Sequence, residues 1–268
     1  MTDTAQEPLP DAVMIAVPTA DGIVTTGHVE TVVEAAAAIS ASGRRYYYRH
    51  VDFVEVVQSR NHLVAMALAR PETSHILFID NDMLVPRQPI ARLLAAGKPV
   101  AGVVYPKRRT NLEAYAQARM DGHDQATARA LASPYVVQLP DGTLTVEKGL
   151  AQVDGVGFGC TLIELRLLRA MIADGRLGRQ KPLDIGHVDT DQDGLIWNFF
   201  ARNLLPNGQV LSEDYAFCAR ARAVEPGCVW AYLGPGALHQ GWFNHGEGAN
   251  FIDRLKALSA LAQAAPKA

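Results

Sequence analysis

Short apolar runs alternate with amphipathic stretches through the first hundred residues of the chain. Residues 13–17 form a continuous apolar run of strand length, which stops at the turn-forming segment 18–22. Hydrophobic residues then recur at helical spacing over residues 28–42, and Gly43 follows as a terminator. The alternation continues with strands expected at 46–57, 76–79 and 100–104 and helices at 59–69 and 89–96. This pattern predicts an α/β fold with a mostly parallel central sheet flanked by helices.

The pattern is less regular in the second half of the chain. Periodicity weakens over residues 107–150, where we expect two hairpin-like pieces, 135–139 and 143–146, joined by a Pro-Asp-Gly turn. Residues 153–163 are typical of a strand interrupted by glycines, which allow a ligand to approach the backbone closely. Helices are expected at 164–173, from 212 onward, and at 251–264, the last on the outside of the fold. The irregular insertion is a candidate lid or acceptor-facing element.

Composition places the chain among globular proteins of ordinary charge. With 268 residues, 49% of them hydrophobic, it can bury a full core, and we expect one domain over residues 1–268. The formal net charge of −3 gives no case for a nucleic-acid partner. The one basic run, Lys107-Arg108-Arg109, is of a kind that is usually a solvated surface patch.

The cysteines and the apolar runs bear on the cell compartment. Cys160, Cys218 and Cys228 are odd in number and lack metal-type or redox spacing, which argues against a disulfide framework or a zinc site. A reducing cytoplasm fits them best. The amino terminus lacks a basic segment followed by a long apolar core, and no apolar run approaches the ~18 residues of a membrane span. Any membrane contact would therefore be peripheral.

The strand expected from residue 76 ends abruptly in Asp80-Asn81-Asp82. An open α/β sheet places its ligand crevice at the carboxyl ends of its strands. Two carboxylates spaced two residues apart at that place can share a hard divalent cation, Mn²⁺ or Mg²⁺, together with the phosphates that it bridges. Taken alone, such a pair has a simpler interpretation, because two acids at a strand end often only solvate a turn or cap a helix.

A second acidic pair lies at the predicted start of a helix. Ser212 is a good N-cap residue, and Glu213 and Asp214 occupy the first turn that follows it. Acids there complement the helix dipole, which is a sufficient structural reason for them. One of the two is alternatively a catalytic base, if a substrate lies beside it.

A glycine-rich segment, residues 233–243, contains a third candidate. His239 offers a neutral imidazole to a metal, and Trp242 is an aromatic ring able to cover a sugar or a base. A lone histidine is more often structural, but the surrounding glycines favour a loop that folds over a ligand. His245 is a weaker alternative.

Two further segments are weaker candidates for a functional site. Residues 189–194 match the opening of a calcium loop, but the twelfth position would be Phe200 instead of a bidentate glutamate, which favours an acidic surface turn. Arg60 and Asn61 stand near the start of a predicted helix. The guanidinium there could face a diphosphate or a base, or equally pair with a surface acid.

Taken in order, the motifs resemble those of GT-A fold glycosyltransferases, and they are most similar to bacterial and phage-type family-2-like enzymes. The resemblance spans residues 13–243 and rests on Val-Pro-Thr, Ser-Arg-Asn, Phe-Ile-Asp-Asn-Asp-Met, Gly-Val-Val-Tyr-Pro, Val-Gly-Phe-Gly-Cys, Ser-Glu-Asp-Tyr-Ala-Phe-Cys and Leu-His-Gln-Gly. It implies a single Rossmann-like GT-A domain with a nucleotide-sugar-binding part at about 11–106, an acceptor-binding part at about 107–250 and a C-terminal helix at 251–264. Residues 107–150 and the acidic turn near residue 189 match no family pattern.

The resemblance also implies roles for individual residues. Asp80, Asp82 and His239 would hold Mn²⁺ or Mg²⁺ on the donor diphosphate. Asp214 would be the base or acceptor-facing carboxylate, with Glu213 beside it. The implied donor-binding set is Pro18, Thr19, Asp21, Arg60, Asn81, Gly157, Phe158 and Trp242, of which Gly157 and Phe158, together with Gly159, would edge the acceptor site.

The implied activity is metal-dependent transfer of a hexosyl group from a UDP- or GDP-type sugar to a hydroxyl of a glycan, a lipid-linked glycan or another acceptor. A base at Asp214 would give inversion at the anomeric carbon, which we favour, although the His-Gln-Gly ending is also similar to retaining members. One alternative is a sugar-phosphate nucleotidyltransferase, which the absence of lysine and arginine from segment 18–22 disfavours. The other is a non-catalytic nucleotide-sugar-binding module, which the presence of the acids and His239 disfavours.

Overall fold

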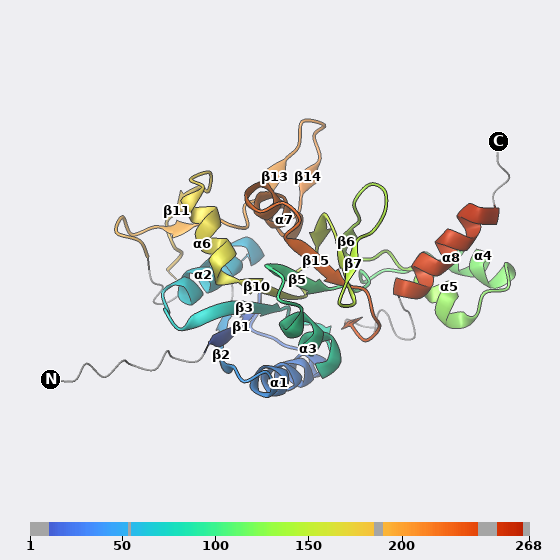
Figure 1. The fold of residues 1–268 in the computed structure, drawn as a ribbon, viewed down its shortest axis with the longest axis horizontal. Coiled ribbons are helices and arrows are strands. Elements are labelled where there is room, and N and C mark those ends of the chain that lie inside the picture. Colours follow the sequence, from blue (N-terminus) through green and yellow to red (C-terminus); the bar gives the residue numbers. More distant parts are fainter. Residues whose placement is uncertain (1–10, 53–54, 185–189, 241–250, 265–268) are drawn as a thin grey trace.

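A central sheet with helices on both faces forms the body of the protein (Figure 1). The structure is a computed structural model and describes residues 11–52, 55–184, 190–240 and 251–264. The eight strands lie in the order β2-β1-β3-β10-β5-β15-β8-β7. Their bounds are β1 (Ala12–Pro18), β2 (Arg45–Val51), β3 (Thr73–Ile79), β5 (Val100–Val103), β7 (Val146–Glu147), β8 (Leu150–Gln152), β10 (Cys160–Glu164) and β15 (Val229–Tyr232).

Strand direction confirms the predicted mostly parallel sheet. Strand β1 pairs in parallel with β2 and β3, and β15 pairs in parallel with β5. Only β10 and β8 run opposite to the other six strands of this sheet, because β10 is antiparallel to β3 and β5 and β8 is antiparallel to β15 and β7. The carboxyl ends of β1 and β3, which are direct neighbours, therefore meet at the same edge of the sheet.

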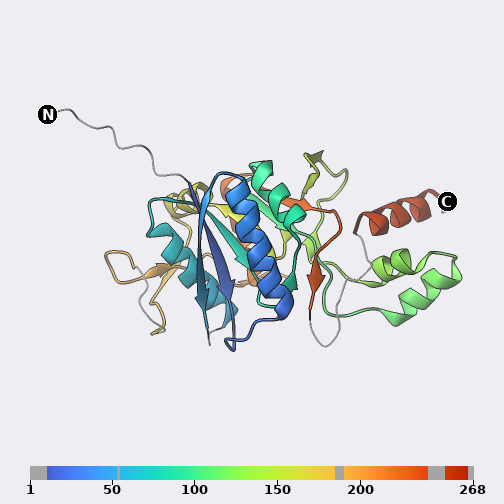
Figure 2. The ribbon, with the colours of Figure 1, turned by 90° about the horizontal axis from the view of Figure 1, so that it is seen from below.

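Helices cover each face of the sheet and bury both sides of β1. Helices α1 (Thr26–Ala41) and α3 (Arg87–Ala96) pack on one face, where Figure 2 shows them side by side, over Val13, Ile15 and Val17. Helices α2 (Val56–Leu68), α6 (Leu165–Ala173) and α7 (Glu213–Val224) pack on the other face, over Met14 and Ala16. Successive side chains of a strand point to opposite faces, so a strand covered on both sides is apolar throughout. This explains the continuous apolar run of the sequence.

Helix α2 begins earlier than the sequence pattern indicates. We expected a strand over residues 46–57 and a helix from Ser59, but β2 ends at Val51 and α2 begins at Val56. Glu55 is the N-cap residue, because its carboxylate accepts a hydrogen bond from the Val57 backbone N–H at 2.9 Å. Capping by glutamate is less common than capping by serine, which is why the pattern misplaced the start. As a consequence Ser59 and Arg60 lie inside the helix and are buried.

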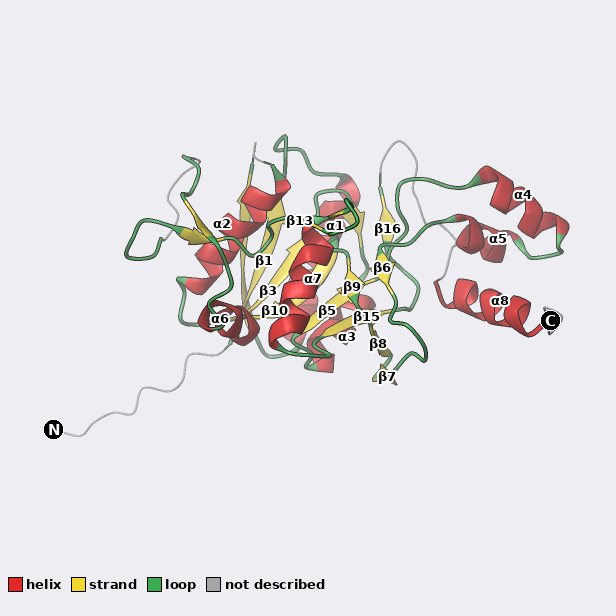
Figure 3. Cartoon of the chain, turned by 90° about the horizontal axis from the view of Figure 1, so that it is seen from above, coloured by secondary structure: helices red, strands yellow, loops and turns green. Residues whose placement is uncertain are grey.

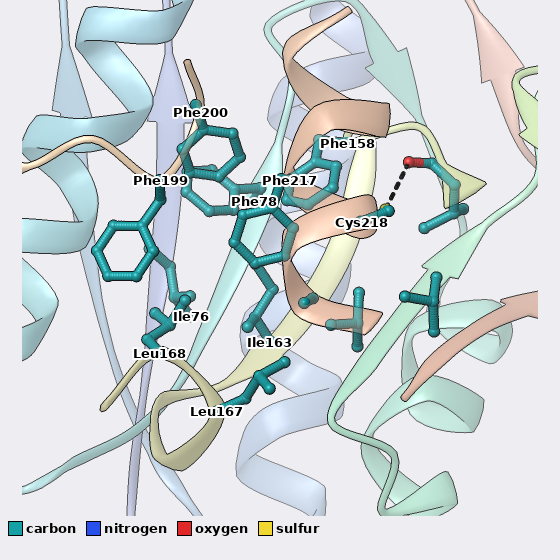
Figure 4. Packing of buried hydrophobic residues seen from close by; sticks show 14 of the residues in the cluster. Ile76, Phe78, Phe158, Ile163, Leu167, Leu168, Phe199, Phe200, Phe217 and Cys218 are labelled. Atoms are coloured by element: carbon teal, nitrogen blue, oxygen red, sulfur yellow. Dashed lines mark hydrogen bonds between the residues drawn. The ribbon is translucent and has the colours of Figure 1, made fainter. Parts of the chain in front are cut away.

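Phenylalanine rings fill the core between the sheet and α7 (Figure 4). Phe200 stacks on Phe217 with ring centroids 4.9 Å apart, and Phe158 meets Phe217 edge-on at 5.1 Å. Phe78 on β3 contacts both Phe158 and Phe200, at 5.8 and 5.6 Å. These four rings, here called the aromatic cluster, come from β3, α7 and two loops. They fix those four segments relative to one another.

A unit of three helices lies beside the body of the protein (Figure 3). It consists of α4 (Leu112–Met120), α5 (Gln125–Ala132) and α8 (Phe251–Ala264). Asn111 and Asp124 cap α4 and α5, and the Arg254 guanidinium of α8 donates to backbone carbonyls at the end of α5. The sequence predicted α8 with these bounds, but it did not predict α4 or α5. Helix α4 is mostly exposed, and α5 is short and buries only alanines, so neither gives a clear hydrophobic pattern.

The remaining strands form short two-stranded ladders. They are β4 (Met83–Leu84) with β16 (Leu238–His239), β6 (Val137–Gln138) with β9 (Gly155–Val156), β11 (Arg179–Gln180) with β12 (Ile196–Trp197), and β13 (Asn203–Leu204) with β14 (Val210–Leu211). The two pieces expected to be joined by the Pro-Asp-Gly turn are therefore not partners, since β6 pairs with β9 and β7 pairs with β8. None of the helices that the structure describes is both long and apolar enough to span a bilayer.

Candidate active site

A cleft of about 270 Å³ lies at the carboxyl ends of β1 and β3. Its wall includes nine of the residues singled out in the sequence: Pro18, Thr19, Arg60, Asn81, Asp80, Asp82, Glu213, Asp214 and His239. Four others, Ala20, Val56, Ser59 and Arg108, complete the lining. The two acidic pairs, more than 130 residues apart in the chain, thus face one cavity.

Arg60 joins the two acidic pairs. Its side chain is only 2% exposed, and its Nη2 donates to the Asp80 Oδ1 at 3.0 Å. Its Nη1 donates to the Glu213 Oε1 at 3.0 Å and also to the Asp214 Oδ1. The sequence left open a pairing with a surface acid, and this alternative is not found, because the Arg60 side chain is buried. Arg60 is a buried cation shared among the carboxylates of the site.

Two rings of the aromatic cluster pack against the Arg60 guanidinium. The guanidinium carbon lies 5.4 Å from the centre of the Phe158 ring and 5.8 Å from that of Phe200. A cation over an aromatic face is attracted to it, most strongly where water is excluded. The neighbouring Asn61 accepts a hydrogen bond from the Phe200 backbone N–H at 3.2 Å, which holds that ring in place. The Ser-Arg-Asn motif therefore builds the floor of the cleft from inside α2.

Asp214 is a buried carboxyl in the first turn of α7. Its Oδ2 accepts a hydrogen bond from the Phe158 backbone N–H at 3.2 Å. Burial, assisted by the nearby Glu213 and Asp80, raises the pKa of Asp214 to about 7, although Arg60 opposes the shift. A carboxyl with a pKa near neutrality can gain or release a proton under physiological conditions, as a general base must.

A strand pairing brings His239 to the acidic loop. Strand β16 pairs with β4 so that His239 lies opposite Met83, and the Gln240 backbone N–H donates to the Asp82 carbonyl at 2.8 Å. The His239 Nε2 then lies 3.2 Å from the Asp82 Oδ2. The ladder thus places an imidazole beside the second acid of the Asp-Asn-Asp segment.

The tautomer of His239 follows from its other contact. Its Nδ1 lies 3.1 Å from the Pro106 carbonyl oxygen, which only accepts hydrogen bonds. The proton of a neutral His239 is therefore on Nδ1, and Nε2 carries a lone pair that accepts from the Arg108 Nε–H at 2.9 Å. A histidine held in this way by a carbonyl is typical of metal ligands.

Helix α1 anchors the acidic loop from the other side. The buried His28 has its Nδ1 2.9 Å from the Asp80 carbonyl oxygen. The Thr31 hydroxyl lies 3.0 Å from the Met83 carbonyl oxygen and accepts from the Val85 backbone N–H at 2.8 Å. Neither His28 nor Thr31 carries a functional signal in the sequence, because both stand within an ordinary helical pattern. They hold the backbone on both sides of Asp82.

Several residues implied by the resemblance lie away from the cleft wall. The Phe158 side chain is fully buried in the aromatic cluster, and a side-chain atom added at Gly157 or Gly159 would meet the Tyr105 ring. These glycines therefore make room for Tyr105, and the Phe158 N–H reaches the site by donating to Asp214. Asp21 is exposed and caps a turn by accepting from the Ile23 N–H at 3.0 Å.

Other candidates fall outside the described residues or form local turns. Trp242, His245 and Asp189 are not among the residues that the structure describes. Asp191 accepts from the Leu195 backbone N–H at 2.9 Å and pairs with Arg179 at 2.9 Å. This geometry is that of an acidic turn.

The cleft carries an excess of negative charge. Four carboxylates and two guanidinium groups line it, which leaves two negative charges when all the acids are ionised. Within the described ranges, no group of three or more histidine, cysteine, aspartate or glutamate side chains is arranged to hold a metal, since the Asp80 carboxylate turns towards Arg60. Asp82 and His239 do lie side by side. Such a pair fits the kind of cation that keeps waters and takes its remaining ligands from substrate phosphates.

Comparisons with known proteins give distant structural likenesses. No family model and no curated protein matches the chain. The solved structures that it is similar to include A197 from STIV, at 16% identity and a TM-score of 0.44, with 86% of each chain covered. They also include a glycosyltransferase involved in the glycosylation of the major capsid of PBCV-1, at 12% identity and a TM-score of 0.30, covering 59% of this chain and 62% of that one. Both scores lie below 0.5, and neither likeness bears on the roles of the residues.

Proposed function

We propose that the protein is a glycosyltransferase that moves a sugar from a nucleoside-diphosphate sugar to an acceptor hydroxyl. The observation that carries the proposal is the shared cleft, which contains both Asp214, a buried carboxyl with a pKa of about 7, and the Asp82 and His239 pair. Arg60 joins Asp214 to Asp80 within this cleft. Asp214 suits proton abstraction, and the Asp82 and His239 pair suits the neutralisation of a leaving diphosphate. The order of the sequence motifs, which resembles that of GT-A enzymes, supports the same division of roles.

The donor diphosphate is assigned to the end of the cleft near Asp82. A diphosphate is repelled by the excess of carboxylates there unless a cation accompanies it. Asp82 and the lone pair on the His239 Nε2 would hold Mn²⁺ or Mg²⁺, and that ion would stabilise the negative charge that develops on the departing phosphate oxygens. Pro18, Thr19 and Asn81 line the adjacent wall, where the nucleoside would lie.

Asp214 is the proposed base. In its ionised form it accepts the proton of an acceptor hydroxyl while that oxygen attacks the anomeric carbon of the sugar. Arg60 keeps the ionised carboxylate in place, and the Phe158 N–H fixes the orientation of its second oxygen. A base on the face opposite the leaving diphosphate gives inversion of configuration. We favour a hexosyl donor of the UDP or GDP type and a glycan, lipid-linked or other hydroxyl acceptor.

Release of nucleoside diphosphate tests the proposal. The purified protein is incubated with a panel of UDP- and GDP-sugars, Mn²⁺ and simple sugar acceptors, and the freed nucleoside diphosphate is measured. We expect release from one donor class, with a loss of at least about 100-fold in Asp82→Asn, since general electrostatic stabilisation of this kind is worth that much. Pyrophosphate formed from a nucleoside triphosphate and a sugar phosphate would instead establish a nucleotidyltransferase.

A further inference from the structure

Arg108 occupies the place that a divalent cation would take between Asp82 and His239. Its Nε donates to the His239 Nε2 at 2.9 Å, and its Nη2 contacts the Asp82 Oδ2. We propose that Arg108 is a built-in competitor of the divalent cation, which leaves this place when the metal and the donor diphosphate bind. The inference rests on the proposed function and deepens it, because it assigns a specific residue to the control of metal and donor binding.

The hydrogen-bond geometry shows that the place between Asp82 and His239 suits a positively charged group. The proton on the His239 Nδ1 faces the Pro106 carbonyl, so the Nε2 lone pair and the Asp82 carboxylate, 3.2 Å away, are two acceptors that both contact the Arg108 guanidinium. Two electron-pair donors so close together need a positive partner between or beside them. Among the described side chains, Arg108 fills that need for both donors.

The Asp82 carboxylate already has Arg108 as its counter-ion. A divalent cation that approaches the Asp82 Oδ2 meets a guanidinium already bound there.

Arg108 differs from Arg60 in its freedom to move. The Arg60 side chain is 2% exposed and bonds three carboxylates, whereas the Arg108 side chain is 52% exposed and extends from the loop that follows β5. A half-exposed ion pair is a weak one because water competes for both partners. Arg60 is thus a fixed part of the site, and Arg108 is a cation that can be exchanged.

The donor provides Arg108 with a new partner. A diphosphate bound beside Asp82 presents several negatively charged oxygens, and a guanidinium pairs readily with phosphate. When the metal takes Asp82 and His239, Arg108 can move to the phosphates instead. Metal and nucleotide should therefore each strengthen the binding of the other, and by linkage the two enhancements are equal.

Titration of Mn²⁺, followed by the electron paramagnetic resonance signal of the free ion, tests the inference in the wild type and in Arg108→Gln. Without nucleotide, we expect Arg108→Gln to bind Mn²⁺ about 10-fold more tightly than the wild type, a coupling within the usual 5–150-fold range. With UDP or GDP present, we expect the wild type to gain affinity for Mn²⁺ and the variant to gain less. The adjacent Arg109→Gln is the matched control, because Arg109 is exposed, does not line the cleft and should leave both titrations unchanged.

Two results would overturn the inference. One is unchanged or weaker Mn²⁺ binding by Arg108→Gln, with circular dichroism showing that the variant is folded. The other is an equal gain of affinity in Arg108→Gln and Arg109→Gln, which would show a general effect of charge. Release of nucleoside diphosphate by the wild type, measured in parallel, separates failure of this inference from failure of the proposed function.

Discussion

The Arg60 guanidinium contacts the carboxylate of Asp214, a residue 154 positions later in the chain. The same guanidinium bonds Asp80, so that one buried cation joins the end of β3 to the start of α7. The two segments supply the proposed donor and acceptor sides of the cleft. Arg60 therefore fixes the distance between the proposed base and the donor site, and stability and activity should both depend on it.

Replacement of Arg60 by glutamine should destabilise the protein strongly. Loss of the guanidinium leaves three carboxyl groups without their buried counter-ion, and removal of one partner of a buried ion pair costs about 3–5 kcal/mol. The loss should be larger at pH 8 than at pH 5, because at pH 5 the buried acids can take up protons instead. Urea unfolding followed by circular dichroism measures both effects.

The control for this experiment is Arg87→Gln. Arg87 is 57% exposed and pairs with Glu34 at 2.7 Å, so its removal should cost less than about 1 kcal/mol. Similar losses for the two variants would show that Arg60 is an ordinary surface charge.

Asp214→Asn should reduce turnover while donor binding is preserved. The asparagine keeps the size of the side chain but cannot accept a proton, and general base catalysis contributes about 10²–10⁴-fold. We expect kcat to fall within that range and the donor KM to change by less than about 3-fold, since this change removes an interaction made in the transition state. Glu213→Gln, which keeps Asp214, should lose much less. A change confined to the donor KM in Asp214→Asn would assign that acid to donor binding.

The pH dependence of turnover should report the ionisation of Asp214. Because its pKa is raised to about 7, the fraction in the base form increases as the pH rises from 5 to about 8. We predict that kcat/KM rises over this interval and levels off above it, and that Asp214→Asn loses the rise. A profile with no inflection between pH 5 and 8 would contradict the assignment.

The same shift makes a prediction for stability. Folding raises the pKa of Asp214 from 3.8, so the folded state holds this proton more tightly than the unfolded state. The stabilisation from this group is complete below about pH 4 and is lost as the pH rises to about 7. The difference in free energy of unfolding between the wild type and Asp214→Asn should therefore be constant below about pH 4 and should change between pH 4 and 7.

Phe200→Ala should destabilise the fold and loosen the support of Arg60. Phe200 is fully buried, stacks on Phe217 and lies under the guanidinium. Truncation of a buried phenylalanine costs about 3–5 kcal/mol. Thermal unfolding measures the loss. Leu204→Ala, at a residue 73% exposed, should change stability by less than about 0.5 kcal/mol, and an equal effect of the two changes would contradict the packing described here.

Local patterns in the sequence were sufficient for β1, β2, β3, β5 and β10 and for much of the cleft wall, but they did not predict β8 or β15. A strand covered on both faces must be apolar, so β1 and β3 were recognised, and the position of Asp80 and Asp82 at a strand end followed from the chain itself. Short or exposed elements such as α4 and α5 lack that signal. The close packing of Gly157 and Gly159 against Tyr105 was not predicted, because a sequence does not show which side chain fills the space beside a glycine.

Contacts between distant residues account for the rest. Arg108 belongs to a basic run of a kind that usually faces solvent, and only the fold shows its contacts with Asp82 and His239. In the same way, the pKa of Asp214 depends on burial and on neighbours from other elements, none of which local spacing reveals. A motif can suggest which residues meet, but the strand ladder between β4 and β16 decides that they do.

Calorimetric titration with UDP, GDP and CDP, with and without Mn²⁺, tests most directly whether this cleft binds a nucleoside diphosphate with a metal. We predict that the wild type binds one of the three at least about 10-fold more tightly with Mn²⁺, and that Asp82→Asn loses this enhancement. Absence of binding to all three by the folded protein, or an enhancement that persists unchanged in Asp82→Asn, would contradict the account.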